Sequence, residues 1–440
     1  MRFRVERIGK IEKADVELKG ITVIAGENNT GKSTVGKALY CIFNSFYQLD
    51  RQIKEARRNR LRIAIRRVLS SEYIVRSDAR GLQARLEKKG IEYPASEEYP
   101  EFKIMLERHI QLFDRNTDEL VALSDDDVHN IAEEVKQIRA VSKKEIYQRI
   151  LSQWLKSEFS NEVNYLPFVN DEIARLTLSI SGDEIEAIIE NHQVIQISNL
   201  RPLHTQAIYI DSPFAIDSLS LAEEAFYPFR RFPADLRDIG VSNHKEHLLE
   251  CLRGKKTKSS ADQAMGEILV DQRMDKILHK LSEACDGEIE LRGSVRPSFQ
   301  YVGKSGVALN LANLSTGMKS FVLIKQLLQN ERLEEKGVLI LDEPEVHLHP
   351  EWQILFAEVI VLLQKEYDMH ILLTTHSPYF LHAIEVYSAR HRIADRCRYY
   401  LAENVDGRAY LENVTRATDS VYNKLLRPFE ILKAVQYREH

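Results

Sequence analysis

The chain of 440 residues has few cysteines, and no two of them stand close together in the sequence. The four are Cys41, Cys251, Cys285 and Cys397. They form no C-x-x-C pair, so disulfides and a zinc site are not expected, and a reducing compartment is indicated. No stretch approaches the about 18 consecutive apolar residues of a membrane helix. The first seven residues, MRFRVER, are charged and lack the apolar core of a signal peptide. We therefore expect a cytoplasmic protein without a membrane partner.

The bulk composition is that of an ordinary globular protein. Hydrophobic residues make up 44% of the chain and charged residues 29%. The net charge of -5 argues against a uniformly basic nucleic-acid coat, although a local basic patch is compatible with it. The length suggests two to three structural units.

A glycine-rich segment near the start carries the first chemical signal. The segment from Gly26 to Thr34, GENNTGKST, fits the phosphate-binding pattern G-x-x-x-x-G-K-[ST]. It follows the apolar stretch 21–24, which predicts a buried parallel strand, and it begins a helix expected over 32–48. Gly26 and Gly31 allow a close backbone approach to phosphate, and Lys32 supplies positive charge to the β- and γ-phosphates. The predicted nucleotide-binding residues of this loop are Gly26, Asn28, Asn29, Thr30, Gly31, Lys32, Ser33 and Thr34.

A pair of carboxylates in the last quarter of the chain supplies the second signal. Asp342 and Glu343 end the apolar stretch 338–341, where two buried acids would be costly without a cation. We expect Asp342 and the Ser33 hydroxyl to hold Mg²⁺, and Glu343 to orient the attacking water. Together with Lys32, these residues predict hydrolysis of a nucleoside triphosphate with Mg²⁺ as cofactor.

Two weaker motifs flank the carboxylate pair. The segment 314–320, LSTGMKS, precedes an apolar helix, with Ser315 as a plausible N-cap. The segment 374–378, TTHSP, places His376 after the next strand. Alone, the first could be only a helix cap and the second only a histidine in a turn. In this order, together with the phosphate loop and the carboxylate pair, they resemble the motif set of ABC-type ATPases.

The segment EPEVHLHP, from Glu343 to Pro350, narrows this resemblance to the RecF/SMC/OLD-like group of ABC-type ATPases. The resemblance implies a head-to-tail dimer, or a higher oligomer, with ATP sandwiched between chains. His376 would then sense the γ-phosphate as a third catalytic residue beside Lys32 and Glu343, while Ser315 and Gly317 of the partner chain would complete the site. Thr316 departs from the usual Gly or Ser of the signature motif, which assigns the close approach to Gly317.

The alternation of strands and helices predicts an α/β fold, and the resemblance makes it an ABC-type ATPase head, a mixed sheet with a P-loop and helical insertions. We assign 1–45, 170–217 and 285–440 to a discontinuous head, 46–169 to a helical insertion, and 218–284 to a second helical segment.

Three features leave alternatives open. The basic segment 51–67 could be a solvated helix or a DNA-binding surface, and the acidic stretch 125–134 could pair with it in another subunit. His347 and His349 are interpreted as structural rather than as a metal pair. Asp211, just after an expected strand, is a candidate for the switch position that a glutamine often occupies in this group.

What is attached to the ATPase distinguishes the members of this group. About 55 residues follow the helix after His376 and contain no acidic cluster suited to a nuclease, so we expect no nuclease domain in this chain. The chain resembles stand-alone ATPase subunits of bacterial anti-phage defence systems, such as those of Septu and PARIS. This implies control of a separate effector, possibly a nuclease. The alternatives are a RecF-like DNA-binding clamp for repair and an ATP-stabilised scaffold with little turnover.

Overall fold

The structure is a computed structural model that describes most of the chain. The described residues are 1–69, 73–77, 81–82, 99–114, 117, 119–164, 173–219, 243–254, 272–293 and 298–436. They form two compact units: Met1–Tyr47 with the described residues from Leu151 onward, and the described residues of Gln48–Ile150. Parts of the predicted segment 218–284, namely 220–242 and 255–271, lie outside the described residues. None of the described helices is long and apolar enough to cross a membrane.

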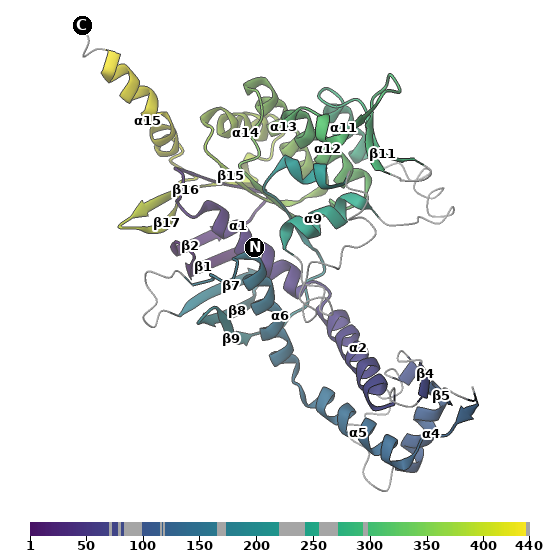
Figure 1. Ribbon diagram of the computed structural model, residues 1–440. Coiled ribbons are helices and arrows are strands. Elements are labelled where there is room, and N and C mark those ends of the chain that lie inside the picture. The colour runs from purple at the N-terminus through teal and green to yellow at the C-terminus, as the bar shows by residue number, and fades with distance from the viewer. Residues whose placement is uncertain are drawn as a thin grey trace. The chain divides into compact units, whose positions relative to one another are not determined.

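The first unit is built on one mixed sheet (Figure 1). Among the described residues, its strand order is β10-β14-β15-β3-β16-β17-β2-β1-β7-β8-β9. The strands are β1 (Arg2–Ile8), β2 (Ile11–Glu17), β3 (Ile21–Gly26), β7 (Ala174–Ile180), β8 (Asp183–Glu190), β9 (Gln193–Ser198), β10 (Ala207–Ile210), β14 (Val338–Asp342), β15 (His370–Thr375), β16 (Cys397–Val405) and β17 (Arg408–Asn413). The predicted α/β fold with a mixed sheet is confirmed.

The strands from β10 to β16 run parallel and bring distant motifs to one edge. The strand β15 lies between β14 and β3, with Asp342 opposite Thr374 and Thr374 opposite Ile24. Because the carboxyl ends of parallel strands meet at the same sheet edge, the segments that follow β3, β14, β15 and β10 all emerge there.

Helices cover both faces of this parallel half. Helix α1 (Lys32–Phe46) packs on one face, where Gly36 lies against Ile340 and Tyr209. On the other face Leu339 and Leu341 join a buried core with α12 (Thr316–Gln329), α13 (Pro350–Tyr367) and α14 (Pro378–Arg390). Successive residues of β14 therefore point alternately to the two helical layers, as the two-residue period of a strand requires.

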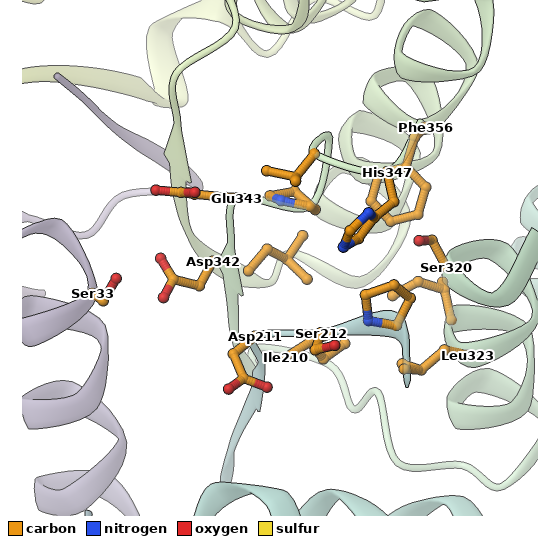
Figure 2. Close-up of a pocket in the computed structure, with 15 residues that line it drawn as sticks. Ser33, Ile210, Asp211, Ser212, Ser320, Leu323, Asp342, Glu343, His347 and Phe356 are labelled. Carbon is orange, nitrogen blue, oxygen red and sulfur yellow. The ribbon is translucent and has the colours of Figure 1, made fainter. Parts of the chain in front are cut away.

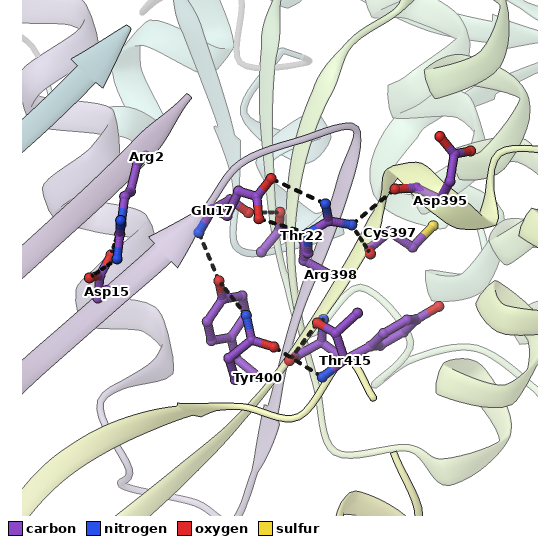
Figure 3. A network of polar contacts seen from close by, with 11 residues as sticks. Arg2, Asp15, Glu17, Thr22, Asp395, Cys397, Arg398, Tyr400 and Thr415 are labelled. Carbon is purple, nitrogen blue, oxygen red and sulfur yellow. Dashed lines mark hydrogen bonds and ion pairs between the residues drawn. The ribbon is translucent and has the colours of Figure 1, made fainter. Parts of the chain in front are cut away.

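Strand β16, which the sequence pattern did not predict, pairs parallel to β3 and is held by a polar network (Figure 3). Arg398 donates from Nε to Glu17 at 2.8 Å and from Nη2 at 3.2 Å. This pairing lowers the pKa of Glu17, although partial burial acts the other way. The Tyr400 hydroxyl accepts from the backbone N–H of Glu17 at 2.8 Å and from the Asn413 amide at 3.2 Å. These contacts join β2, β16 and β17 beside the strand that leads to the phosphate loop.

The remaining elements of the first unit surround this core. They are the end of α6 (Lys143–Glu158), η3 (Pro213–Leu219), α9 (His244–Arg253), α11 (Gln272–Leu281), β11 (Glu288–Arg292), β12 (Ser298–Val302), β13 (Ala308–Asn310), η4 (Leu311–Asn313), η5 (Ala394–Arg396) and α15 (Asp419–Gln436). Strands β11, β12 and β13 form a separate antiparallel sheet.

The second unit contains helices and a small sheet. Its elements are α2 (Leu49–Leu69), β4 (Tyr73–Ser77), α4 (Tyr99–His109), β5 (Ile110–Asp114), β6 (Leu120–Val121), α5 (Asp125–Ala140) and the first part of α6. The prediction of a helical module is therefore incomplete, because β4, β5 and β6 form an antiparallel sheet. A buried cluster that includes Leu61, Ile65 and Ile131 gives this unit its own core.

The acidic and basic stretches of this unit meet within the same chain. Helix α2 packs on α5, and the guanidinium of Arg67 contacts the carboxylate of Glu134. Lys103 contacts Asp125 at 2.8 Å. Pairing of the acidic stretch with another subunit is therefore not needed to explain its charge.

Candidate functional site

The phosphate loop connects the end of β3 to the start of α1, as predicted. Gly31 has a φ of 76°, and a side chain there would place its Cβ 2.5 Å from Cδ1 of Ile11, so only glycine fits. The Lys32 side chain is 4% exposed, and its ammonium donates to the carbonyls of Gly26 at 3.1 Å and Glu27 at 2.7 Å. Burial lowers the pKa of Lys32, an effect that the neighbouring carboxylates oppose.

A cavity of about 580 Å³ lies against this loop. Its volume falls in the range of small-molecule and cofactor sites. It is lined by Gly9, Lys10, Asn29, Thr30, Gly31, Lys32, Ser33, Thr34, Glu162, Asn164 and Glu343. The loop residues predicted to bind nucleotide, from Asn29 to Thr34, thus share one cavity with Glu343.

The carboxylate of Glu343 lies between the side chains of Lys32 and His376. Its Oε1 is 3.8 Å from the Lys32 ammonium and also contacts Nε2 of His376. The hydrogen bond with His376 lowers the pKa of Glu343, although partial burial acts in the other direction. The structure therefore brings together the three residues predicted to be catalytic, with the carboxylate held in its ionised form.

Two hydroxyl groups fix the carboxylate of Asp342. The Tyr209 hydroxyl donates to Oδ2 at 2.9 Å, and the Thr374 hydroxyl donates to Oδ1 at 2.5 Å. Both oxygens of this predicted metal ligand are thus oriented by neighbouring strands, β10 and β15. Such outer contacts commonly fix the direction of a metal-binding carboxylate.

A second cavity, of about 220 Å³, adjoins Asp342 (Figure 2). The Asp342 carboxylate points toward Ser33, which lies across the cavity on α1. A hydroxyl and a carboxylate are the hard oxygen ligands that Mg²⁺ prefers, with water and phosphate oxygens completing its shell. The donor set therefore fits the metal. Asp211, the candidate switch residue, also lines this cavity, together with His347.

The signature segment begins helix α12. Ser315 is its N-cap and accepts from the backbone N–H of Met318 at 3.4 Å. Gly317 is packed against Trp352, because a Cβ there would lie 2.9 Å from Cε3 of the indole ring. Ser315 is exposed and Gly317 is buried within its own chain. Neither residue lines the two cavities described above.

Three supporting residues were missed by the sequence analysis. Tyr209 and Thr374 bind Asp342, and the buried carboxylate of Glu345 accepts from the Thr375 hydroxyl at 2.5 Å and the His376 N–H at 2.9 Å. Thr374 and Glu345 lie within the segments 374–378 and 343–350, so the hydroxyl and the acid at these positions were the available signals. For Tyr209 the only signal was its position in the strand before Asp211.

The match with known proteins agrees with this geometry. The model of the AAA ATPase domain family matches residues 4–381. The chain belongs to this family. Membership of this family implies nucleotide binding and ATPase activity.

One curated relative and several solved structures are similar to parts or all of the chain. The Retron Ec83 probable ATPase of Escherichia coli is 30% identical over 125 residues, which cover 25% of this chain and 22% of that relative. The SMC head domain from Thermotoga maritima shares 12% identity over 94% of this chain and 98% of its own, with a TM-score of 0.34. An Smc head domain from Pyrococcus furiosus, bound to the C-terminal domain of ScpA, shares 12% identity over 99% and 98%, with a TM-score of 0.37. The family assignment rests on the family match.

Proposed function

We propose that this ATPase is a switch that closes head-to-tail around Mg²⁺ and ATP and controls a separate effector. The observation that carries the proposal is the position of Glu343, whose carboxylate contacts His376 and lies 3.8 Å from Lys32. Kept ionised in a cavity beside the phosphate loop, it can accept a hydrogen bond from the attacking water and orient it. Bound Mg²⁺, held by Ser33 and Asp342, would polarise the phosphate oxygens.

Dimerisation is supported by the exposed start of α12, the helix that the signature segment 314–320 begins. Ser315 is exposed at the start of α12, and the N-terminal end of a helix carries partial positive charge and N–H donors. A nucleotide bound to the partner chain is a fitting acceptor for that end. ATP then links the two chains and hydrolysis releases them.

An effector, possibly a nuclease, and a role in anti-phage defence are supported by two likenesses. The motifs resemble those of stand-alone ATPase subunits of defence systems, and 125 residues are similar to a retron ATPase. These are analogies, and the site itself carries only the ATPase and its switch.

The test compares the wild type with Lys32→Ala and Glu343→Gln, using phosphate release and light scattering with and without ATP. We expect Glu343→Gln to slow turnover on the order of 10²-fold or more while retaining ATP and accumulating a dimer. Lys32→Ala should lose nucleotide binding and ATP-dependent association. Glu351→Gln, the same change at an exposed glutamate nearby, serves as the matched control. A wild type without ATP hydrolysis and without ATP-dependent association would contradict the proposal.

The same experiment separates the scaffold alternative. A scaffold predicts that Glu343→Gln leaves biological activity intact, because turnover is not needed, while Lys32→Ala abolishes assembly. The switch predicts loss of activity in both variants.

A DNA-binding clamp is the second candidate, and helix α2 favours it. Arg51, Lys54, Arg62 and Arg66 are exposed along this helix. Leu61, Ile65 and Leu69, on neighbouring turns, are buried in the core of that unit. A basic row of this kind can follow a phosphate backbone.

The clamp is tested by the salt dependence of DNA binding. Replacing Arg51, Arg62 and Arg66 by Gln should weaken binding and flatten the slope of log K against log salt by roughly 0.9 for each phosphate that the protein no longer neutralises. The control replaces Lys13, Lys365 and Arg390, which are exposed on other elements. Equal slopes for wild type and the α2 variant would exclude this surface as the DNA site.

A further inference from the structure

A buried histidine outside the motif set lies between two carboxylates. His244, the first residue of α9, has a side chain that is only 6% exposed. Its Nδ1 lies 2.6 Å from Oε1 of Glu158, and its Nε2 lies 3.0 Å from Oδ2 of Asp211. Its backbone N–H also donates to Oε2 of Glu158 at 3.1 Å. The imidazole is therefore hydrogen-bonded to Glu158 through Nδ1 and faces the Asp211 carboxylate at ion-pair distance through Nε2.

The charge of this histidine follows from the same contacts. Burial disfavours the imidazolium form, but the neighbouring carboxylates of Asp211 and Glu158 outweigh it and raise the pKa of His244. The Glu158 side chain is 1% exposed and is also approached by Lys37 at 4.0 Å. Asp211 is approached by Lys245 at 3.4 Å. Lys37 and Lys245 thus place positive charge beside the two carboxylates that flank the imidazole.

The fixed imidazole supports the ring of Tyr209. The two rings lie 4.5 Å apart between centroids, with an angle of 33° between their planes. Two aromatic rings in offset contact at this separation attract each other. Tyr209 is 1% exposed and reaches in the other direction with its hydroxyl, which donates to Asp342 at 2.9 Å.

The contacts form one continuous path. It runs from the end of α6 at Glu158, through His244 and Tyr209, to the carboxylate of Asp342. Tyr209 lies on β10, and Asp211 directly follows that strand. The same short segment therefore supplies both the aromatic ring and one of the carboxylates that flank the imidazole. A shift of α9 or of the end of α6 would therefore be felt at Asp342.

We propose that Tyr209 is a positioning residue for the magnesium-binding Asp342, and that His244, clamped between Glu158 and Asp211, holds Tyr209 in place. The inference rests on the proposed role of Asp342 as a magnesium ligand. Tyr209 touches neither nucleotide nor metal in this role. It acts by keeping the carboxylate turned toward Ser33.

The test measures binding of a fluorescent ATP analogue in EDTA and at a series of Mg²⁺ concentrations. Tyr209→Phe keeps the ring and removes only the hydroxyl. We expect its affinity for the analogue in EDTA to equal that of the wild type, while the Mg²⁺ concentration for half-maximal tightening rises by about 10-fold to 100-fold, the usual effect of removing a group that orients a metal ligand. Tyr40→Phe removes a hydroxyl from a ring 6.2 Å from Tyr209 and serves as the matched control, with an unchanged Mg²⁺ response. A Tyr209→Phe protein with the wild-type Mg²⁺ response would overturn the inference.

The role of His244 is tested by a double-mutant cycle. His244→Gln should raise the half-maximal Mg²⁺ concentration in the wild-type background and have little further effect in Tyr209→Phe, because the two residues act through one hydroxyl. If the two substitutions instead raise the half-maximal Mg²⁺ concentration by factors that multiply in the double variant, the proposed role of His244 is overturned. Thermal unfolding of each variant checks folding. If His244→Gln does not fold, Glu158→Gln, which leaves one carbonyl oxygen for the two His244 donors that Oε1 and Oε2 now serve, replaces it in the cycle with the same expected outcome.

The binding assay also separates this inference from the proposed function. A wild type that binds the analogue more tightly with Mg²⁺, beside a Tyr209→Phe variant that does the same, leaves the ATPase site intact and sinks only the positioning role. A wild type that binds no nucleotide, with or without Mg²⁺, sinks both.

Discussion

At Glu343 the backbone adopts a left-handed conformation, with a φ of 50°. A residue other than glycine in this region costs about 1–3 kcal/mol unless the surrounding contacts impose it. Here the N–H of Glu343 donates both to the carbonyl of Thr374 at 3.2 Å and to its hydroxyl at 3.0 Å. The left-handed conformation turns the chain directly after Asp342, the proposed metal ligand, so that the adjacent carboxylates can point to different partners.

Glu345, two residues after Glu343, holds the backbone of His376 in place. Its side chain is 3% exposed, and burial raises its pKa. One oxygen accepts from the Thr375 hydroxyl and from the N–H of His376. His376 is thereby held at its backbone by Glu345 and at its ring by Glu343. The side chain of Gln353 connects the same two loops, donating to the carbonyl of Glu345 and accepting from the Ser377 hydroxyl.

Replacing Glu345 tests whether this acceptor is needed. Glu345→Gln keeps a carbonyl oxygen for both donors, so we expect ATP hydrolysis within a few-fold of the wild type. Glu345→Ala leaves two buried donors without an acceptor, which costs about 1–3 kcal/mol for each, and should reduce hydrolysis at least 10-fold through displacement of His376. Phosphate release, nucleotide affinity and thermal unfolding are measured together. Equal losses of hydrolysis in both variants would mean that the negative charge, rather than the acceptor, is what His376 requires.

The strands whose own residues form a continuous apolar stretch were predicted from the sequence. Strands without such a stretch were missed. The apolar stretches 21–24 and 338–341 are buried on both faces, and they became β3 and β14. Strand β16 pairs with β3 over more than 370 residues of intervening chain, a contact that no local pattern encodes. The same holds for β4, β5 and β6, whose short segments lie between strongly helical ones.

The candidate site could be proposed from the sequence where chemistry demands particular residues. Lys32, Ser33, Asp342 and Glu343 were proposed because phosphate and metal binding restrict the residue types and their spacing. Tyr209 and Glu345 were not, because their roles come from strand register and loop packing. A tyrosine in a strand is ordinary until β10 is known to lie beside β14.

Helix α12 is linked to the segment after β10 by a partly buried ion pair. The Lys319 side chain is 3% exposed, and its ammonium donates to Asp217 at 2.8 Å and to the carbonyl of Ala312 at 3.2 Å. It also lies 5.1 Å from the ring of Phe214. Because Asp217 and Phe214 belong to η3, the start of α12 and the segment after Asp211 are held together. The helix that carries Ser315 is thereby fixed relative to a loop that lines the cavity beside Asp342.

At the scale of the whole molecule, topology explains how the motifs come together. Lys32 and Asp342 are about 310 residues apart, yet β15 is the only strand between β3 and β14 in the described sheet. The intervening chain can leave the sheet edge and return without disturbing the site. Part of this intervening chain forms the second unit, which has its own core.

The proposed dimer predicts that two defective chains can repair each other. Ser315→Asp keeps a good N-cap but places a negative charge where the partner's γ-phosphate would bind, so we expect hydrolysis to fall at least 10-fold. Ser315→Asn also keeps the cap and adds no charge, and it should retain nearly full hydrolysis. A dimer of one Lys32→Ala chain and one Ser315→Asp chain has one intact site, made of Lys32 from the second chain and Ser315 from the first. If each site turns over independently, an equal mixture should recover roughly a quarter of wild-type phosphate release, although each variant alone is nearly inactive. A mixture no more active than its components, in which mixed dimers are verified by pull-down through a tag on one chain, would show that each site is not shared between chains in this way.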